Sequence, residues 1–63
     1  MKRLRLGIDV GGTNTDGVVV DEQGGVVAAA KTATTPEPLD GIRTVMAKVI
    51  EGIDKASITQ VML

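Results

Sequence analysis

Several residue types are missing from this chain of 63 residues: it has no cysteine, no histidine, and no phenylalanine, tyrosine or tryptophan. Without cysteine it forms no disulfide, and without cysteine and histidine it lacks the ligands of the common structural zinc sites. A domain this small buries only about 60% of its unfolded surface and usually depends on such staples. Because aromatic side chains bury the most area per residue, a core of aliphatic residues alone is thin. We therefore expect the chain to be one edge of a larger fold.

A strong charge imbalance is also missing: 7 basic and 8 acidic residues give a net charge of −1. A nucleic-acid-binding surface needs a basic face, so we predict no nucleic-acid partner. The basic cluster of Lys2, Arg3 and Arg5 does not begin a signal peptide, because Arg5 and Asp9 interrupt the apolar stretch that should follow it. No apolar run is long enough to cross a membrane. These features predict a cytoplasmic protein with no membrane partner, and the lack of cysteine fits a reducing compartment.

Hydrophobic alternation predicts three strands in the first half of the chain. Residues 4–10 alternate aliphatic residues with polar or small ones, which is typical of a strand with one apolar face. Asp9 then lies near the end of that strand, on the face opposite the aliphatic side chains. Residues 16–21 and 26–34 predict two further strands, because each follows a glycine-containing turn.

The second half of the chain predicts one helix and a fourth strand. Pro38 suits the first turn of a helix, and Asp40 would lie near its positive end. Residues 57–63 predict the fourth strand, which gives the order β-β-β-α-β, with an antiparallel meander and a crossover to a parallel strand. Apolar residues at spacings of three and four predict a helix of about four turns with one apolar stripe: Leu39, Ile42, Val45, Met46, Val49, Ile50 and Ile53.

The chain ends on Val61, Met62 and Leu63, with no turn residue and no polar tail. Bare apolar strands invite aggregation, so natural domains seldom end on one. We expect residues 1–63 to be the opening segment of a longer protein, with no domain boundary inside it.

The stretch D-V-G-G-T-N-T-D at residues 9–16 has the composition of a working turn. It is not a dinucleotide fingerprint, which needs G-x-G-x-x-G before a helix, because here a strand follows. It is not a nucleotide P-loop either, since no lysine lies between Arg5 and Lys31.

A phosphate-cradling hairpin is the remaining functional interpretation. Gly11 and Gly12 permit positive φ and expose backbone N–H groups, while Thr13 and Asn14 add side-chain donors. Asp9 would hold Mg²⁺ through water, because Mg²⁺ gives up its hydration shell reluctantly. By themselves these residues are equally compatible with a tight hairpin whose glycines serve turn geometry alone, and whose aspartates cap the turn.

Two blocks resemble the amino terminus of the hydantoinase A / 5-oxoprolinase family. The first is G-I-D-V-G-G-T-x-T-D at residues 7–16, and the second is K-T-x-T-T-P at residues 31–36, which runs into the helix at Gly41 and Ile42. The first block alone is shared across the actin-like ATPase superfamily, which includes sugar kinases, whereas the two blocks together at this spacing are more specific. Many family members carry an aromatic residue where Asn14 stands, so the resemblance leaves the subfamily and the substrate open.

The resemblance implies an α/β fold of the actin-like, ribonuclease-H-like type, of which β-β-β-α-β is the opening. It also implies ATP and Mg²⁺ as cofactors, with ATP helping to open a cyclic amide such as hydantoin or 5-oxoproline. By motif matching, Asp9 would organise Mg²⁺ and its waters. The same matching assigns the phosphate-binding turn and its support to Gly11, Gly12, Thr13, Asn14, Thr15 and Asp16.

The expected partners are a cyclic-amide substrate, the rest of the parent chain and, as the resemblance allows, a second hydantoinase-type subunit. One turn supplies only part of what phosphoryl transfer needs, so we expect the 63-residue chain alone to be inactive. Two alternatives stay open: a sugar kinase of the same superfamily, against which the K-T-x-T-T-P block speaks, and a non-catalytic actin-like module.

Overall fold

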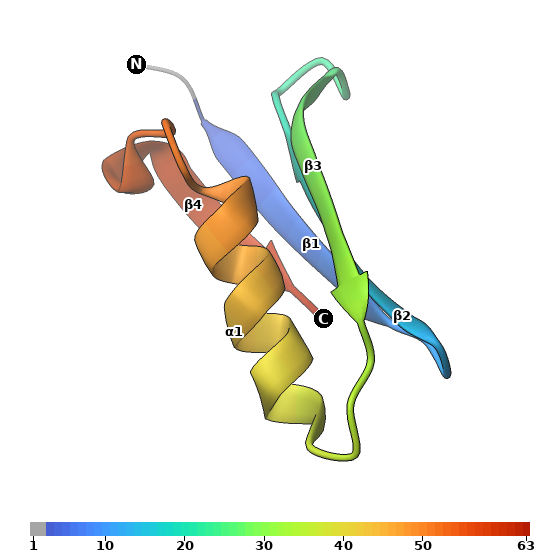
Figure 1. Ribbon diagram of the computed structural model, residues 1–63. Helices are drawn as coiled ribbons and strands as arrows, with labels where there is room; N and C mark the ends of the chain where they lie inside the picture. The colour runs from blue at the N-terminus through green and yellow to red at the C-terminus, as the bar shows by residue number, and fades with distance from the viewer. Residues whose placement is uncertain (1–2) are drawn as a thin grey trace.

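The computed structural model describes residues 3–63 and has the predicted element order, with four strands and one α-helix (Figure 1). A short 3₁₀ turn, η1 (Lys55–Ser57), precedes the last strand. The elements are β1 (Leu4–Val10), β2 (Asn14–Val20), β3 (Val26–Ala33), α1 (Pro38–Val49) and β4 (Ile58–Met62).

The four strands form one mixed sheet in the order β3-β2-β1-β4. β1 pairs antiparallel with β2, and β2 pairs antiparallel with β3, which confirms the predicted meander. β4 lies parallel to β1, which confirms the crossover through the helix. Because β1 is central, its last residues and the turn after it lie in the middle of one end of the sheet.

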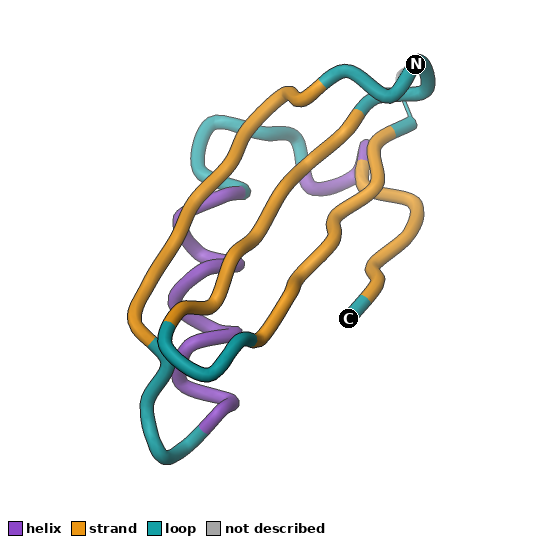
Figure 2. The backbone as a smooth tube through the Cα atoms, turned by 90° about the vertical axis from the view of Figure 1, so that its right-hand side faces the viewer, coloured by secondary structure: helices purple, strands orange, loops and turns teal. Residues whose placement is uncertain are grey.

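The helix covers one face of the sheet and leaves the other face bare within residues 3–63. In Figure 2 the strands stand in front of the helix, so the uncovered face is turned to the viewer. The alternation in β1 sends its aliphatic side chains toward the helix, and the buried core follows from it: Leu4, Leu6, Ile8, Val19, Val45 and Val49. Asp9 is exposed and belongs to the uncovered face, as predicted.

Gly17 is the point of closest approach between β2 and α1. A β-carbon at this position would overlap the Cγ1 atom of Val45, and it would also contact Val49. Val45 is fully buried against this site. The helix therefore packs directly against the backbone of Gly17, because any side chain at this position would hold the two elements apart.

The helix starts as predicted and ends earlier than predicted. Pro38 lies in its first turn, and the Glu37 side chain accepts a hydrogen bond from the Leu39 amide (3.2 Å). The prediction of a helical stripe to Ile53 was wrong, because the helix ends at Val49 and Gly52 follows with a φ of 79°. Leu39 was also wrongly placed in the apolar contact, since it is 53% exposed. No helix in residues 3–63 is long and apolar enough to cross a membrane.

Candidate functional site: the turn between β1 and β2

The glycine turn is shorter and tighter than the sequence predicted. β2 begins at Asn14, so the turn consists of residues 11–13, and the predicted strand start at position 16 was two residues late. The Gly11 amide donates to the Asn14 carbonyl oxygen at 2.9 Å, which closes the turn. Thr15 and Asp16 therefore belong to the strand.

Neither turn glycine is required by its backbone angle, and only Gly11 is required for space. The glycines with positive φ in residues 3–63 are Gly24 and Gly52, so the turn does not use the positive φ that Gly11 and Gly12 permit. A β-carbon on Gly11 would lie 3.0 Å from the Asn14 carbonyl oxygen, which is tighter than an ordinary contact. A β-carbon on Gly12 would meet nothing within 4 Å. Gly12 therefore faces open space that a ligand atom can enter.

Two backbone donors at the tip of the turn stay available. Within the described part of the chain, neither the Gly12 amide nor the Thr13 amide donates a hydrogen bond to another residue. Both residues are exposed, and so is Asn14, whose side-chain amide donates to the Thr13 hydroxyl oxygen at 3.2 Å. Unbonded backbone N–H groups in a turn are available as hydrogen-bond donors to an anion.

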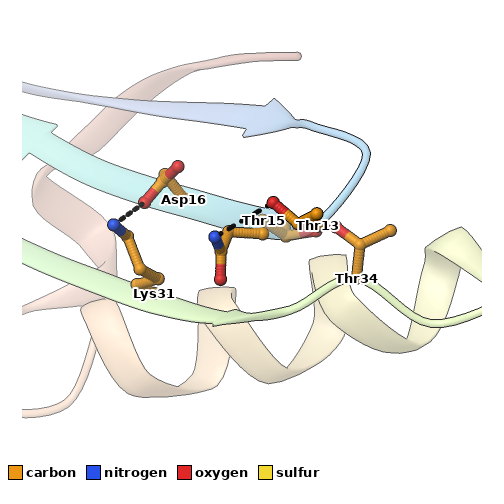
Figure 3. A network of polar contacts seen from close by, with 6 residues as sticks. Thr13, Thr15, Asp16, Lys31 and Thr34 are labelled. Carbon is orange, nitrogen blue, oxygen red and sulfur yellow. Dashed lines mark hydrogen bonds and ion pairs between the residues drawn. The ribbon is translucent and has the colours of Figure 1, made fainter.

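Thr34, the first residue after β3, bonds to this turn at two points. The Thr34 amide donates to the Thr13 carbonyl oxygen at 2.9 Å, and the Thr34 hydroxyl donates to the Gly11 carbonyl oxygen at 2.8 Å. The Thr34 and Thr15 hydroxyl oxygens lie 2.9 Å apart, and Thr15 is fully buried. Figure 3 shows Thr13, Thr15 and Thr34 gathered at this end of the sheet. Thr15 consequently supports the turn and has no surface for a ligand.

Two carboxylates lie beside the turn on the uncovered face of the sheet. Asp9 on β1 stands directly opposite Asp16 on β2, and Lys31 on β3 stands opposite Asp16. The Lys31 ammonium lies 3.7 Å from the Asp16 carboxylate, with 65% and 48% of the two side chains exposed (Figure 3). Such an exposed pair contributes little stability, so its main effect is on the local charge.

The same two carboxylates border an open hollow of about 280 Å³ on the uncovered face. Its floor is apolar and formed by the central strands and the end of β4. The remaining lining residues are Gly7, Ile8, Val18, Met62 and Leu63. Almost all of the surface that lines this hollow is apolar, so it offers apolar contact rather than polar groups to a small molecule.

Residues 5–63 match the model of the hydantoinase/oxoprolinase N-terminal region. The chain belongs to this family. The match confirms the resemblance carried by the G-I-D-V-G-G-T-x-T-D and K-T-x-T-T-P blocks, and it supports a hydantoinase-type role for the protein. Comparison with curated proteins and with solved structures gave no match.

The hydantoinase/oxoprolinase turn brings together most of the residues that its sequence singled out. Asp9, Gly12, Thr13 and Asn14 are exposed around the tip of the turn or beside it, and Asp16 faces Asp9. Of the remaining two, Gly11 is also exposed and closes the turn through its amide, whereas Thr15 is buried and bonds to Thr34.

Sequence reasoning missed the physical roles of Lys31 and Thr34. Both stand in the K-T-A-T-T-P block, whose residues resemble a family signature but show no structural function in the sequence alone. Thr34 bonds to residues 19 and 23 positions earlier in the chain. No local signal in the sequence points to these roles, because the bonding partners depend on how β3 pairs with β2.

Proposed function

We propose that this chain forms the phosphate-binding edge of an ATP-dependent hydrolase that opens a cyclic amide of the hydantoin or 5-oxoproline type. The observation that carries the proposal is the pair of backbone amides at Gly12 and Thr13, which donate to no other described residue and belong to exposed residues. A hairpin that served geometry alone would have no need of a second glycine whose φ is not positive. The family match supports the amide hydrolase over the sugar kinase.

In this proposal the turn binds phosphate through its backbone. The Gly12 and Thr13 amides donate to phosphoryl oxygens, and the absence of a side chain at Gly12 lets those oxygens approach closely. The exposed Thr13 hydroxyl and the Asn14 side-chain amide lie next to this surface and supply further donors. Hydrogen bonds to a charged acceptor are about twice as strong as neutral ones, so two or three of them suffice to orient the phosphate.

The carboxylates fit a hydrated magnesium ion better than a dehydrated one. Within residues 3–63 no three acidic, histidine or cysteine side chains are close enough to enclose a metal. Mg²⁺ is commonly held by one or two carboxylates together with waters and phosphate oxygens, and Asp9 with Asp16 offers that set. Bound there, Mg²⁺ would offset the repulsion between these carboxylates and the phosphate. Asp9 is then the principal holder, because Asp16 already has Lys31 beside it.

Phosphoryl transfer depends on positioning and charge neutralisation from several sides. When bound, ATP would supply a phosphoryl group to the amide oxygen with ADP as the leaving group, and water would then attack the activated ring carbon and release phosphate. Residues 3–63 contribute one turn and two carboxylates to this task. We therefore propose that the isolated chain hydrolyses no cyclic amide, and ATP-dependent ring opening by the 63-residue chain would contradict this.

The substitution Gly12→Ala separates phosphate binding from turn geometry. Because φ at this position is not positive and a β-carbon meets nothing, alanine fits the folded turn. Its methyl group instead occupies the space assigned to a phosphate oxygen. In the full-length protein we expect unchanged or slightly higher stability and at least about tenfold weaker binding of ATP with Mg²⁺, the value of one hydrogen bond to a charged group.

Isothermal titration calorimetry and denaturant unfolding of the same protein preparations provide the two readouts. The contrary result is equal ATP affinity in the Gly12→Ala variant and the parent protein, which would leave the turn as a hairpin without a phosphate role. The matched control is Thr35→Val, since Thr35 is exposed and its hydroxyl donates to the Glu37 carbonyl oxygen away from the turn.

A further inference from the structure

Among the described residues outside the turn, Thr34 bonds to both ends of the turn, at Gly11 and at Thr13. Its hydroxyl reaches the Gly11 carbonyl oxygen at 2.8 Å, and its amide reaches the Thr13 carbonyl oxygen at 2.9 Å. The two available amides, on Gly12 and Thr13, lie between these two bonds. Thr34, from outside the hairpin, therefore holds the peptide group that carries the Gly12 amide and the peptide group that follows Thr13.

The protons in this network have one consistent direction. A carbonyl oxygen only accepts, so the Thr34 hydroxyl proton is used on Gly11. Thr34 can then only accept at its oxygen from Thr15, whose hydroxyl lies 2.9 Å away. The chain of bonds runs from the Thr15 hydroxyl to the Thr34 hydroxyl to the Gly11 carbonyl. A hydroxyl at position 34 is required because it both accepts and donates.

The buried end of this chain is held by the helix. Thr15 is fully buried, and a β-carbon on Gly41, in the first turns of α1, would lie 3.0 Å from the Thr15 hydroxyl oxygen. A buried hydroxyl needs a partner, and Thr34 supplies it. Thr15, which lies next to Gly41 of the helix, is thereby linked to the turn through Thr34, 19 residues later in sequence.

We propose that Thr34 is a positioning residue that preorganises the Gly12 and Thr13 amides for phosphate. The proposal rests on the proposed phosphate-binding function of the turn. Backbone donors that are already in position bind the ligand without an ordering cost. A turn that lacks the bonds to Thr34 must instead be ordered when phosphate binds. In this proposal the K-T-x-T-T-P block of this chain helps to position the turn. Thr34, the first of its two adjacent threonines, is the residue that does so.

The test compares three single variants in the full-length protein, with ATP and Mg²⁺ as the probe. Thr34→Val removes the hydroxyl but keeps the shape and the backbone amide bond, and we expect ATP binding to weaken at least about tenfold. Thr34→Ser restores the hydroxyl, and we expect affinity within about threefold of the parent protein. Thr35→Val removes a neighbouring hydroxyl that also bonds to a backbone carbonyl at 2.8 Å, and we expect no change in affinity.

A double variant separates positioning from plain stability. Thr34→Val alone leaves the buried Thr15 hydroxyl without a partner, which destabilises the fold. Thr15→Val with Thr34→Val removes both partners, so we expect stability to return toward that of the parent protein while ATP binding stays weak. In steady-state ATP hydrolysis the same variants should raise KM for ATP more than they lower kcat, because the bonds of Thr34 serve binding.

Each outcome decides the proposal. Weak binding in Thr34→Val and in the double variant, with rescue by serine, supports it. Normal ATP affinity in Thr34→Val overturns the positioning role and leaves the phosphate function of the turn intact. Recovery of affinity together with stability in the double variant, or its failure to fold, shows a structural role only and overturns it as well. Absence of ATP binding by the parent protein overturns the phosphate function, and this inference with it.

Discussion

Asp9 and Asp16 stand directly opposite each other on neighbouring antiparallel strands, on the face of the sheet that the helix leaves uncovered. Like charges in directly opposed positions destabilise a sheet by a few tenths of a kcal/mol to about 1 kcal/mol. Lys31 reaches Asp16 at 3.7 Å and offsets part of this repulsion, but Asp9 has no such partner among the described residues. The sheet therefore tolerates a carboxylate pair at the end nearest the glycine turn, which is where a phosphate-bound cation would use it.

Asp9→Asn should raise stability and lower function together. Removal of one charge relieves the opposed pair, so we expect the free energy of unfolding to rise by about 0.2–1 kcal/mol. Binding of ATP in the presence of Mg²⁺ should fall, because the neutral amide is a poor ligand for the cation. Denaturant unfolding and calorimetric titration measure the two quantities. Asp40→Asn, an exposed position in the first turn of α1, is the control and should leave ATP affinity unchanged.

Gly17→Ala should destabilise the protein without changing the turn directly. The added methyl group would overlap the Cγ1 atom of Val45, and both residues are buried, so the helix must shift away from β2. Overpacking of this kind costs about 1–3 kcal/mol. The double variant Gly17→Ala with Val45→Ala should lose less than the sum of the two single losses, since the smaller side chain makes room. Strict additivity in thermal or denaturant unfolding would show that the two residues do not meet.

Gly52→Ala should also destabilise the protein, for a reason that differs from the case of Gly17. Gly52 has a φ of 79° just after the helix, and nothing lies within 4 Å of a β-carbon there. The cost is thus backbone strain alone, about 1–2 kcal/mol. Gly12→Ala serves as the matched comparison, because Gly12 also has open space around it but no positive φ. Equal stability of the Gly52→Ala protein and its parent would contradict the left-handed conformation at this residue.

The local elements could be predicted because their causes are local. Alternation in residues 4–10 places the aliphatic side chains of β1 on one face, and the core contains Leu4, Leu6 and Ile8 as expected. Proline and glutamate at positions 38 and 37 start the helix through contacts within one turn. The error at the end of the helix also has a local cause. The apolar spacing continues past Val49 to Ile53, but periodicity alone does not show that the chain turns at Gly52.

The candidate site also has one part that could be predicted from the sequence and one part that could not. Its exposed residues could be named from the short stretch 9–16, because a carboxylate followed by glycines and small donors has few uses. The role of Thr34 could not be predicted, because its bonds to Thr15 and Gly11 depend on β3 lying beside β2 in one register. A shift of that register by one residue would turn these side chains to the opposite face.

By itself the sequence determined the strands, the helix, the family and the composition of the turn, since each depends on residue type and short-range spacing. The tertiary structure alone decided that Gly11 is needed for space beside Asn14, that Gly17 receives Val45, and that Lys31 faces Asp16. It also placed Thr34 beneath the turn. The physical reason is that the contacts of Lys31 with Asp16, Thr34 with Gly11 and Gly17 with Val45 join residues 15, 23 and 28 positions apart, separations over which sequence periodicity carries no information.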